Sequence, residues 1–154
     1  MFSLLLILTS LLSCQNPQFE DEDGGTRLKF VPTTSDLTRG TVSIGDYFSR
    51  LAVQMFDQDG NKVFSQSKTQ AKDDDNFGTL NVGLKTGTYT VVAVGHSSPV
   101  TPTIKSMELV QFTAKDGVKN SDTFCHYGQV TINEDGGYHE LKMNRVTAMI
   151  MLSF

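Results

Sequence analysis

The chain has 154 residues, two cysteines, no tryptophan and a formal net charge of −4. This length suits one ordinary domain with a single hydrophobic core. A slightly acidic chain without a basic cluster gives no reason to expect nucleic acid as a partner.

The N-terminus is typical of an export signal that ends at a lipid-attachment cysteine. Residues Phe2 to Leu12 are almost wholly apolar, yet they are fewer than the roughly 18 residues that a membrane-spanning helix needs. Small residues and a cleavage point normally follow such a core, and here Ser13 precedes Cys14, as in the lipobox of bacterial lipoproteins. We predict a signal peptide over residues 1–13 and lipid attachment at Cys14. An ordinary buried helix is the alternative, disfavoured by the terminal position.

Two questions about this region stay open. No Lys or Arg precedes the apolar core, although signal peptides usually begin with one, so the true start can lie upstream of Met1. Residues 14–25 are polar and acidic and predict a disordered tether. The acidic run Glu20–Asp23 is either a solvated linker or, by resemblance, the stretch that routes Bacteroidetes lipoproteins to the outer surface.

From Thr26 onward, short alternating segments separated by turn residues predict an all-β sandwich or barrel. We expect a first strand over Thr26–Val31 that Pro32 ends, and then an irregular crossing, Thr33–Phe48, with at most one helical turn. The next strand, Arg50–Phe56, alternates two sets of residues: Leu51, Val53 and Met55 on one face, and Arg50, Ala52, Gln54 and Phe56 on the other.

Turn chemistry predicts how the next strands are connected. The Asp-Gly pair in Asp57–Asn61 predicts a hairpin, with Lys62–Lys68 as the return strand. Asp73–Asn76 is expected to be a loop before a strand over Phe77–Leu84. A tight turn at Lys85–Gly87 follows, in which the glycine can adopt a positive φ.

The second half contains the most apolar segment. Thr88–Val94 is apolar on both faces, which predicts a central strand covered on both sides, ended by the loop Gly95–Pro99. Three further strands are expected, with a hairpin turn at Glu134–Gly137 before the last: Ile104–Phe112, Asp122–Ile132 and Tyr138–Phe154.

The closing run remains apolar up to the last residue, Phe154. Because an unprotected hydrophobic edge invites pairing with other chains, we expect either a domain truncated before further sequence or a strand that pairs with another subunit.

These motifs, in this order, resemble the N-terminal domain of the FimB/Mfa2 family of Bacteroidetes fimbrial subunits. The resemblance runs from about Thr26 to the C-terminus; Cys125-His126, where the family often has aromatic residues, departs from it. The segments that carry it are Ser49–Val63, Phe77–Leu80, Gly87–His96, Asp122–Phe124 and Asn144–Met149.

The resemblance implies a transthyretin-like Greek-key β-sandwich of about seven strands over residues 26–154. It also implies a lipoprotein of the bacterial outer membrane, exposed at the cell surface, that anchors a type V pilus or forms a minor part of it. Pilin subunits would then be the partners, contacted by β-strand pairing. Family members normally continue into a second domain, so we expect the given sequence to stop before one.

No catalytic or metal-binding constellation is evident. The three histidines, His96, His126 and His139, lie in separate segments, with His96 expected in a loop, so they lack metal-ligand spacing. The Asp57–Asn61 segment departs from a calcium loop, because its glycine comes too early and no glutamate stands at the twelfth position. We expect neither a cofactor nor an enzymatic activity.

Several single residues have ordinary interpretations. Cys125 is expected to be a small buried apolar group, and Asp73–Asp75 a solvated loop. Arg39 is better explained as an exposed arginine than as a protease-processing site. Ser97 and Ser98 lack the glycine elbow of a nucleophile.

The leading hypothesis is therefore a lipid-anchored fimbrial subunit. The rival is a surface sandwich that binds glycans or a protein ligand for nutrient uptake, which an aromatic platform would favour. The candidates for such a platform are Tyr47, Phe48, Tyr127 and Tyr138.

Overall fold

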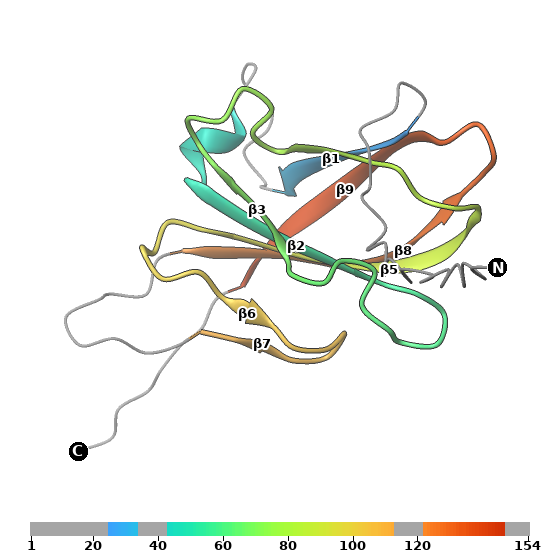
Figure 1. Cartoon of the computed structure of the whole chain (residues 1–154). Coiled ribbons are helices and arrows are strands. Elements are labelled where there is room, and N and C mark those ends of the chain that lie inside the picture. The colour runs from blue at the N-terminus through green and yellow to red at the C-terminus, as the bar shows by residue number, and fades with distance from the viewer. Residues whose placement is uncertain (1–24, 34–42, 113–121, 147–154) are drawn as a thin grey trace, which may run out of the picture.

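The computed structural model describes residues 25–33, 43–112 and 122–146, and in these ranges one 3-10 turn is the only helical element. Seven strands form one sheet in the order β3-β2-β5-β8-β9-β1-β4, and β6 and β7 form a separate hairpin (Figure 1). The elements are β1 (Thr26–Thr33), η1 (Ile44–Asp46), β2 (Arg50–Phe56), β3 (Lys68–Ala71), β4 (Thr79–Val82), β5 (Gly87–His96), β6 (Thr103–Ile104), β7 (Val110–Gln111), β8 (Thr123–Ile132) and β9 (Gly137–Val146).

The seven-stranded sheet curls into two layers. In Figure 1, β1 and β9 lie above β2, β5 and β8, and the β6–β7 hairpin lies below them. The layers join through β8 and β9, whose paired residues are confined to Thr123–Cys125 and Asn144–Val146, with a bridge at the turn between Asn133 and Gly136. The predicted all-β, transthyretin-like Greek-key sandwich of about seven strands is confirmed.

The His126 side chain occupies the interval in which β8 and β9 separate. Its Nδ1 lies 2.9 Å from the carbonyl oxygen of Lys142 on β9, a group that a neighbouring strand would otherwise pair. A Cβ added at Gly128 would lie 2.9 Å from His126 Nε2. A glycine at this position therefore leaves room for the ring.

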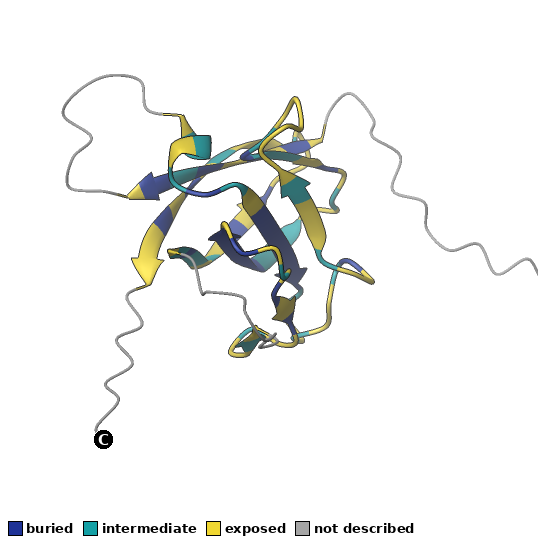
Figure 2. Cartoon of the chain, turned by 90° about the vertical axis from the view of Figure 1, so that its left-hand side faces the viewer, coloured by how far each residue is buried: buried dark blue, intermediate teal, exposed yellow. Residues whose placement is uncertain are grey.

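The main core lies between the layers. Alternating residues of facing strands supply it, as expected where a sheet buries one face. Figure 2 shows buried residues on the facing strands and exposed residues at loops and strand edges. The buried members are Leu28, Phe30, Phe48, Leu51, Val53, Met55, Phe64, Val82, Val91, Ala93, Phe124, Val130, Ile132, Leu141 and Met143.

A second, smaller cluster lies on the other face of β2 and β5. It consists of Ala52, Phe56, Val92, Val94 and Ile104. Ile104 belongs to β6 and is 1% exposed, so the β6–β7 hairpin contributes to covering this face. The prediction that the Thr88–Val94 strand is central and covered on both sides is confirmed.

The strand β1 extends through Pro32, contrary to the expectation that this proline ends it. The Phe30 N–H donates to the Gly78 carbonyl on the β4 side at 2.8 Å, and Pro32, two residues on, directs its nitrogen to that same side. There β4 pairs with β1 only over Thr26–Lys29. A missing N–H is therefore tolerated.

The predicted hairpin turn at Asp57–Asn61 is present, with Gly60 at φ +81°. The return strand begins later than predicted, at Lys68. Phe56 bridges to Lys62, and the ladder with β2 resumes only at Lys68. In the intervening bulge, buried Gln54 replaces the ladder: its Nε2 donates to the Phe64 carbonyl at 3.1 Å, and the Phe64 N–H donates to its Oε1 at 3.3 Å.

Three other boundaries differ from the sequence prediction. Gly87 does not adopt a positive φ and is the first residue of β5. His96 is the last residue of that strand instead of lying in a loop. Ile104–Phe112 is not one strand but part of the short β6–β7 hairpin, which turns between Lys105 and Leu109.

Candidate functional site

The predicted lipid-attachment residue, Cys14, lies outside the described residues, as do Arg39 and the closing segment 147–154. The lipid, the tether and the end of the last strand therefore remain predictions. In the described residues, no helix has the length and apolar character that crossing a membrane requires.

The titratable residues considered in the sequence do not assemble into a metal site. Across the described ranges, no group of three or more His, Cys, Asp or Glu side chains is placed to hold a metal ion. Asp57 instead stabilises its own hairpin turn, because it accepts the Asn61 N–H at 2.8 Å and the Asp59 N–H at 3.0 Å. Bonds from Asn61 are the largest cause of the lowered pKa of Asp57.

Cys125 is a free thiol that is half-buried, less covered than the sequence suggested. It packs against the small cluster under β6–β7, and burial raises the pKa of its thiol. A raised thiol pKa disfavours the nucleophilic thiolate.

The two sheet edges, β3 and β4, are held to each other by Gln70. Its Nε2 donates to the Thr79 carbonyl at 2.7 Å, and its Oε1 accepts the Gly78 N–H at 3.0 Å. Asp74, from the loop expected to be merely solvated, accepts the Ala71 N–H at 2.7 Å. These bonds occupy backbone groups that an exposed edge would otherwise offer to another chain.

The end of β9 extends past β1, because the register of these two strands ends at Thr33 and Asn144. Val146 is 47% exposed. Just before it, Arg145 pairs with Asp122 at 3.1 Å and lies over the Phe124 ring, 5.4 Å from its centroid. These contacts hold the end of β9 against the start of β8.

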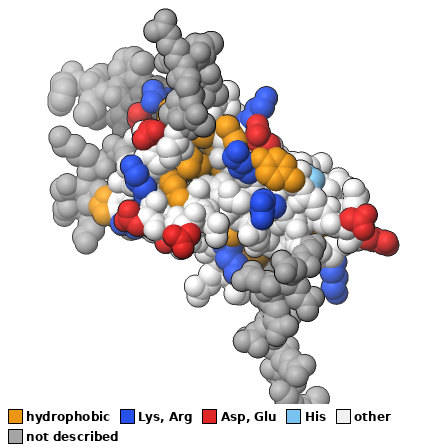
Figure 3. Space-filling model, turned by 90° about the horizontal axis from the view of Figure 1, so that it is seen from above, with side chains coloured by type: hydrophobic (Ala, Val, Ile, Leu, Met, Phe, Trp, Pro, Cys, Tyr) orange, Lys and Arg blue, Asp and Glu red, His pale blue; other side chains and the backbone are white. Residues whose placement is uncertain are grey.

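The candidate aromatic platform does not assemble as one surface. Phe48 is buried in the core, and Tyr47 is partly buried and packs edge-to-face on Phe124, with centroids 5.8 Å apart. Tyr127 and Tyr138 are 66% and 56% exposed, but they belong to different strands, and neither forms a ring contact within the described ranges. In Figure 3, basic and acidic side chains are interspersed on the face seen from above.

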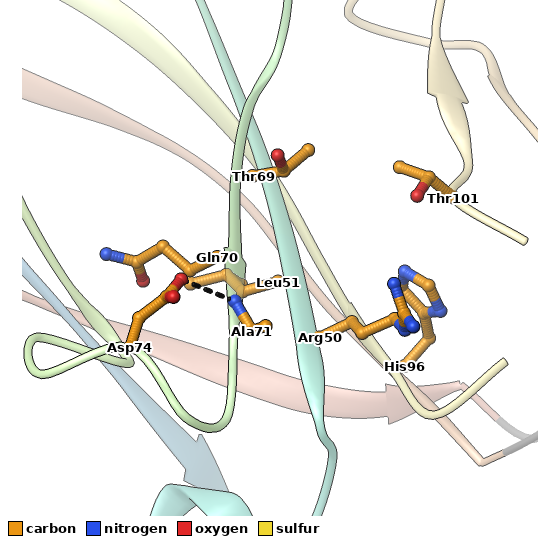
Figure 4. A pocket seen from close by; sticks show the side chains of 8 residues that line it. All are labelled: Arg50, Leu51, Thr69, Gln70, Ala71, Asp74, His96 and Thr101. Carbon is orange, nitrogen blue, oxygen red and sulfur yellow. Dashed lines mark hydrogen bonds between the residues drawn. The ribbon is translucent and has the colours of Figure 1, made fainter. Parts of the chain in front are cut away.

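A polar pocket with a volume of about 180 Å³ lies beside the β3 edge. Arg50, at the start of β2, is the register partner of both Ala71 on β3 and His96 on β5. Thr101 lines the pocket from the loop before β6 (Figure 4). This pocket was not predicted from the sequence, because His96 was expected in a loop. Continuing the alternation Val92, Val94, His96 places the ring on the covered face.

His96 is the most unusual residue of this pocket. It is 1% exposed, and neither ring nitrogen has a hydrogen-bond partner in the described structure. Its ring packs edge-to-face on Phe112, with centroids 6.0 Å apart. Burial and, next, the positive charge of Arg50 lower the pKa of His96, an effect that the nearby Ser98 backbone opposes.

The described strands define a transthyretin-like β-sandwich. Residues 15–154 match the family described as fimbrillin-A associated anchor proteins Mfa1 and Mfa2. The chain belongs to this family. The predicted family resemblance is thus confirmed.

Solved structures with the same fold come from Bacteroides. A proposed adhesin of Bacteroides thetaiotaomicron aligns at 14% identity with TM-score 0.57, covering 79% of this chain and 45% of the other. A proposed adhesin of Bacteroides ovatus aligns at 14% identity with TM-score 0.56, covering 79% and 46%. A proposed polysaccharide-binding protein of B. thetaiotaomicron aligns at 11% identity with TM-score 0.51, covering 79% and 47%.

These identities support the fold alone, and the chain spans about half the length of each of these proteins. A search of the curated proteins by sequence gave no match.

Proposed function

We propose that this chain is a lipid-anchored subunit of the bacterial outer membrane that anchors a type V pilus or forms a minor part of it. The observation that carries the proposal is the match of residues 15–154 to a family of fimbrial anchor proteins. The match begins directly after Cys14, which fits a mature protein whose first residue bears the lipid.

Contact with pilin subunits is proposed to occur by strand pairing at the end of β9. The β3 and β4 edges carry the Gln70 and Asp74 bonds, whereas Val146 is exposed and leads into the apolar residues that follow. In β-augmentation, main-chain hydrogen bonds supply affinity, and alternate side chains set the register. An apolar, alternating segment such as residues 146–154 suits that geometry.

The lipid anchor is tested by Cys14→Ala in the native bacterium. Loss of the thiol removes the attachment point, so the protein and its attached fimbriae should move from the membrane fraction to the medium. Cys125→Ala is the matched control, because it removes the other cysteine and should leave both on the cell. Fimbriae that stay cell-bound with Cys14→Ala would contradict the proposal.

Strand pairing is tested separately with Ile150→Pro, which removes one backbone N–H and fixes φ. Less pilin should then co-purify with the protein, while the conservative variant Ile150→Val should retain it. Equal recovery with both variants would exclude main-chain pairing by this segment and leave the lipid test unaffected.

A second candidate function is the binding of a glycan or protein ligand at the cell surface for nutrient uptake. The observation that favours it is the exposure of Tyr127 and Tyr138, since exposed tyrosines are common in recognition surfaces. Replacing both with alanine should abolish binding to a glycan panel if this function holds, and should leave cell-bound fimbriae unchanged.

A further inference from the structure

The pocket beside β3 is built by residues that share one face of the sheet. Ala71, Arg50 and His96 form a row across β3, β2 and β5. The next row places Thr69 opposite Ala52 of the small cluster, on the face that β6 helps to cover. In Figure 4, Arg50 and His96 lie next to each other, with the Thr69 and Thr101 side chains across the pocket.

The buried imidazole is the group that most needs a ligand. A neutral imidazole has one N–H donor and one acceptor nitrogen. Leaving such groups buried without partners costs free energy, and native structures rarely do so without a functional reason. His96 lines the pocket, so a hydroxyl group that enters beside its ring can supply a partner for one ring nitrogen.

The charge of the pocket specifies the other part of the ligand. Arg50 is exposed and has no carboxylate within ion-pair distance in the described structure. The Asp74 carboxylate, on the far side of the pocket, already accepts the Ala71 N–H. An arginine guanidinium can form two parallel hydrogen bonds with a carboxylate, while Thr69 and Thr101 offer hydroxyl groups suited to a hydroxylated ligand.

We propose that this pocket binds the carboxylate of an acidic monosaccharide, such as a hexuronate residue of a glycan. Arg50 pairs with the sugar carboxylate, the His96 imidazole and the two threonine hydroxyls bond to ring hydroxyls, and the volume of about 180 Å³ holds a single sugar ring. This function is additional to pilus anchoring and does not depend on it.

A compact ligand fits the site better than an added peptide strand. The Lys72 N–H donates to the carbonyl of Ser49, the residue before β2, at 2.9 Å. The alternate residues Ala71 and Thr69 therefore direct their backbone groups away from β2, to the free edge of β3. Asp74 occupies the Ala71 N–H. A pairing strand would therefore lack one of the N–H donors that the free edge of β3 would offer it.

The test is a titration of the full chain with D-glucuronate. Calorimetry and NMR of the histidine ring nitrogens monitor the binding. We expect saturable binding and a change in the His96 ring signals, with neither produced by the neutral analogue D-glucose. Arg50→Gln should weaken binding about tenfold or more, as for the loss of a charge-assisted hydrogen bond. Arg27→Gln is the matched control on the other layer and should bind like wild type.

Thr101→Val provides a second variant, because Thr101 is exposed and its replacement should preserve the fold; binding should weaken. Absence of saturable glucuronate binding would overturn the proposal. Equal binding of acetate, or binding of an aspartate-containing peptide without binding of glucuronate, would overturn the sugar assignment and indicate a simple carboxylate site. Binding unaffected by Arg50→Gln and Thr101→Val would place the sugar elsewhere.

Discussion

At the residue scale, a few buried polar and small side chains account for the local geometry. Gln54 is 0% exposed, and its amide forms both hydrogen bonds with the Phe64 backbone. It therefore satisfies backbone groups in the bulge where β2 has no ladder partner on the β3 side. A side chain with this role is difficult to replace.

Replacing Gln54 with leucine should lower the free energy of unfolding by about 2 to 3 kcal/mol, because buried backbone groups of Phe64 and Met55 lose their partner. Urea denaturation would measure the change. Gln129→Leu, at an exposed site of β8, should change stability by less than about 0.5 kcal/mol. Similar losses for the two variants would contradict the role assigned to Gln54.

Gly95 makes a second, steric prediction. A Cβ at Gly95 would lie 2.6 Å from the buried Phe48 ring, so Gly95→Ala should destabilise the fold by about 1 to 3 kcal/mol. A Cβ at Gly87 would meet only ordinary contacts, beginning at 3.6 Å. Gly87→Ala is therefore the control, and thermal unfolding should separate the two variants.

His96 predicts how stability depends on pH. Its pKa is lowered from 6.5 in the folded protein, so the unfolded chain binds the proton more readily. The contribution of neutral His96 to the free energy of unfolding is fully present above about pH 6.5. It is lost as the pH falls through the pKa that His96 has in the folded protein. His96→Gln should flatten this part of the curve of melting temperature against pH, whatever its effect at pH 8. An unchanged slope would contradict the assignment.

At the element scale, the sheet edges and the β6–β7 hairpin differ in how firmly they are held. Gln70 links β3 to the β4 region through the Thr79 carbonyl and the Gly78 N–H. The hairpin has only two paired positions, Thr103 with Gln111 and Ile104 with Val110. Elements with so few hydrogen bonds open at lower free energy than the core.

Gln70→Ala should therefore release the Gly78 amide, and its hydrogen exchange should become faster. Exchange at Val91, in the centre of β5, should shift only by the loss in global stability. Gln111→Ala, an exposed site on β7, should leave Gly78 protected. An unchanged Gly78 exchange rate in Gln70→Ala would show that the edge is held by other contacts.

At the scale of the whole molecule, one core joins both layers. Leu28 and Leu141 from one layer and Val53 and Val91 from the other belong to the same buried cluster. We expect one cooperative unfolding transition for this sandwich, with the β6–β7 hairpin opening separately at lower free energy. Calorimetry tests the single transition. Hydrogen exchange at Ile104, compared with exchange at Val91, tests the separate opening of the hairpin.

Much of this arrangement was predictable from local pattern. The alternation of residues predicted both ends of the strand Arg50–Phe56 correctly. Apolar residues on both faces identified β5 as a central strand. The Asp-Gly pair located the turn at Gly60. Prediction failed where a distant group decides the outcome. Pro32 stays within its strand because the pairing of β1 with β4 stops at Lys29. The return strand after Asn61 is delayed because Gln54 bonds to the backbone of the bulge.

The sequence by itself determined the all-β class, the family and the candidate lipid cysteine, because alternation, turn residues and the lipobox are local signals. Only the tertiary structure decided that Arg50, His96, Thr69 and Thr101 share one pocket. Strand register brings these residues together across β3, β2 and β5, and register depends on which strands pair rather than on neighbours in the chain. Burial of His96 without a partner likewise became visible only once the loop before β6 and Phe112 were in place.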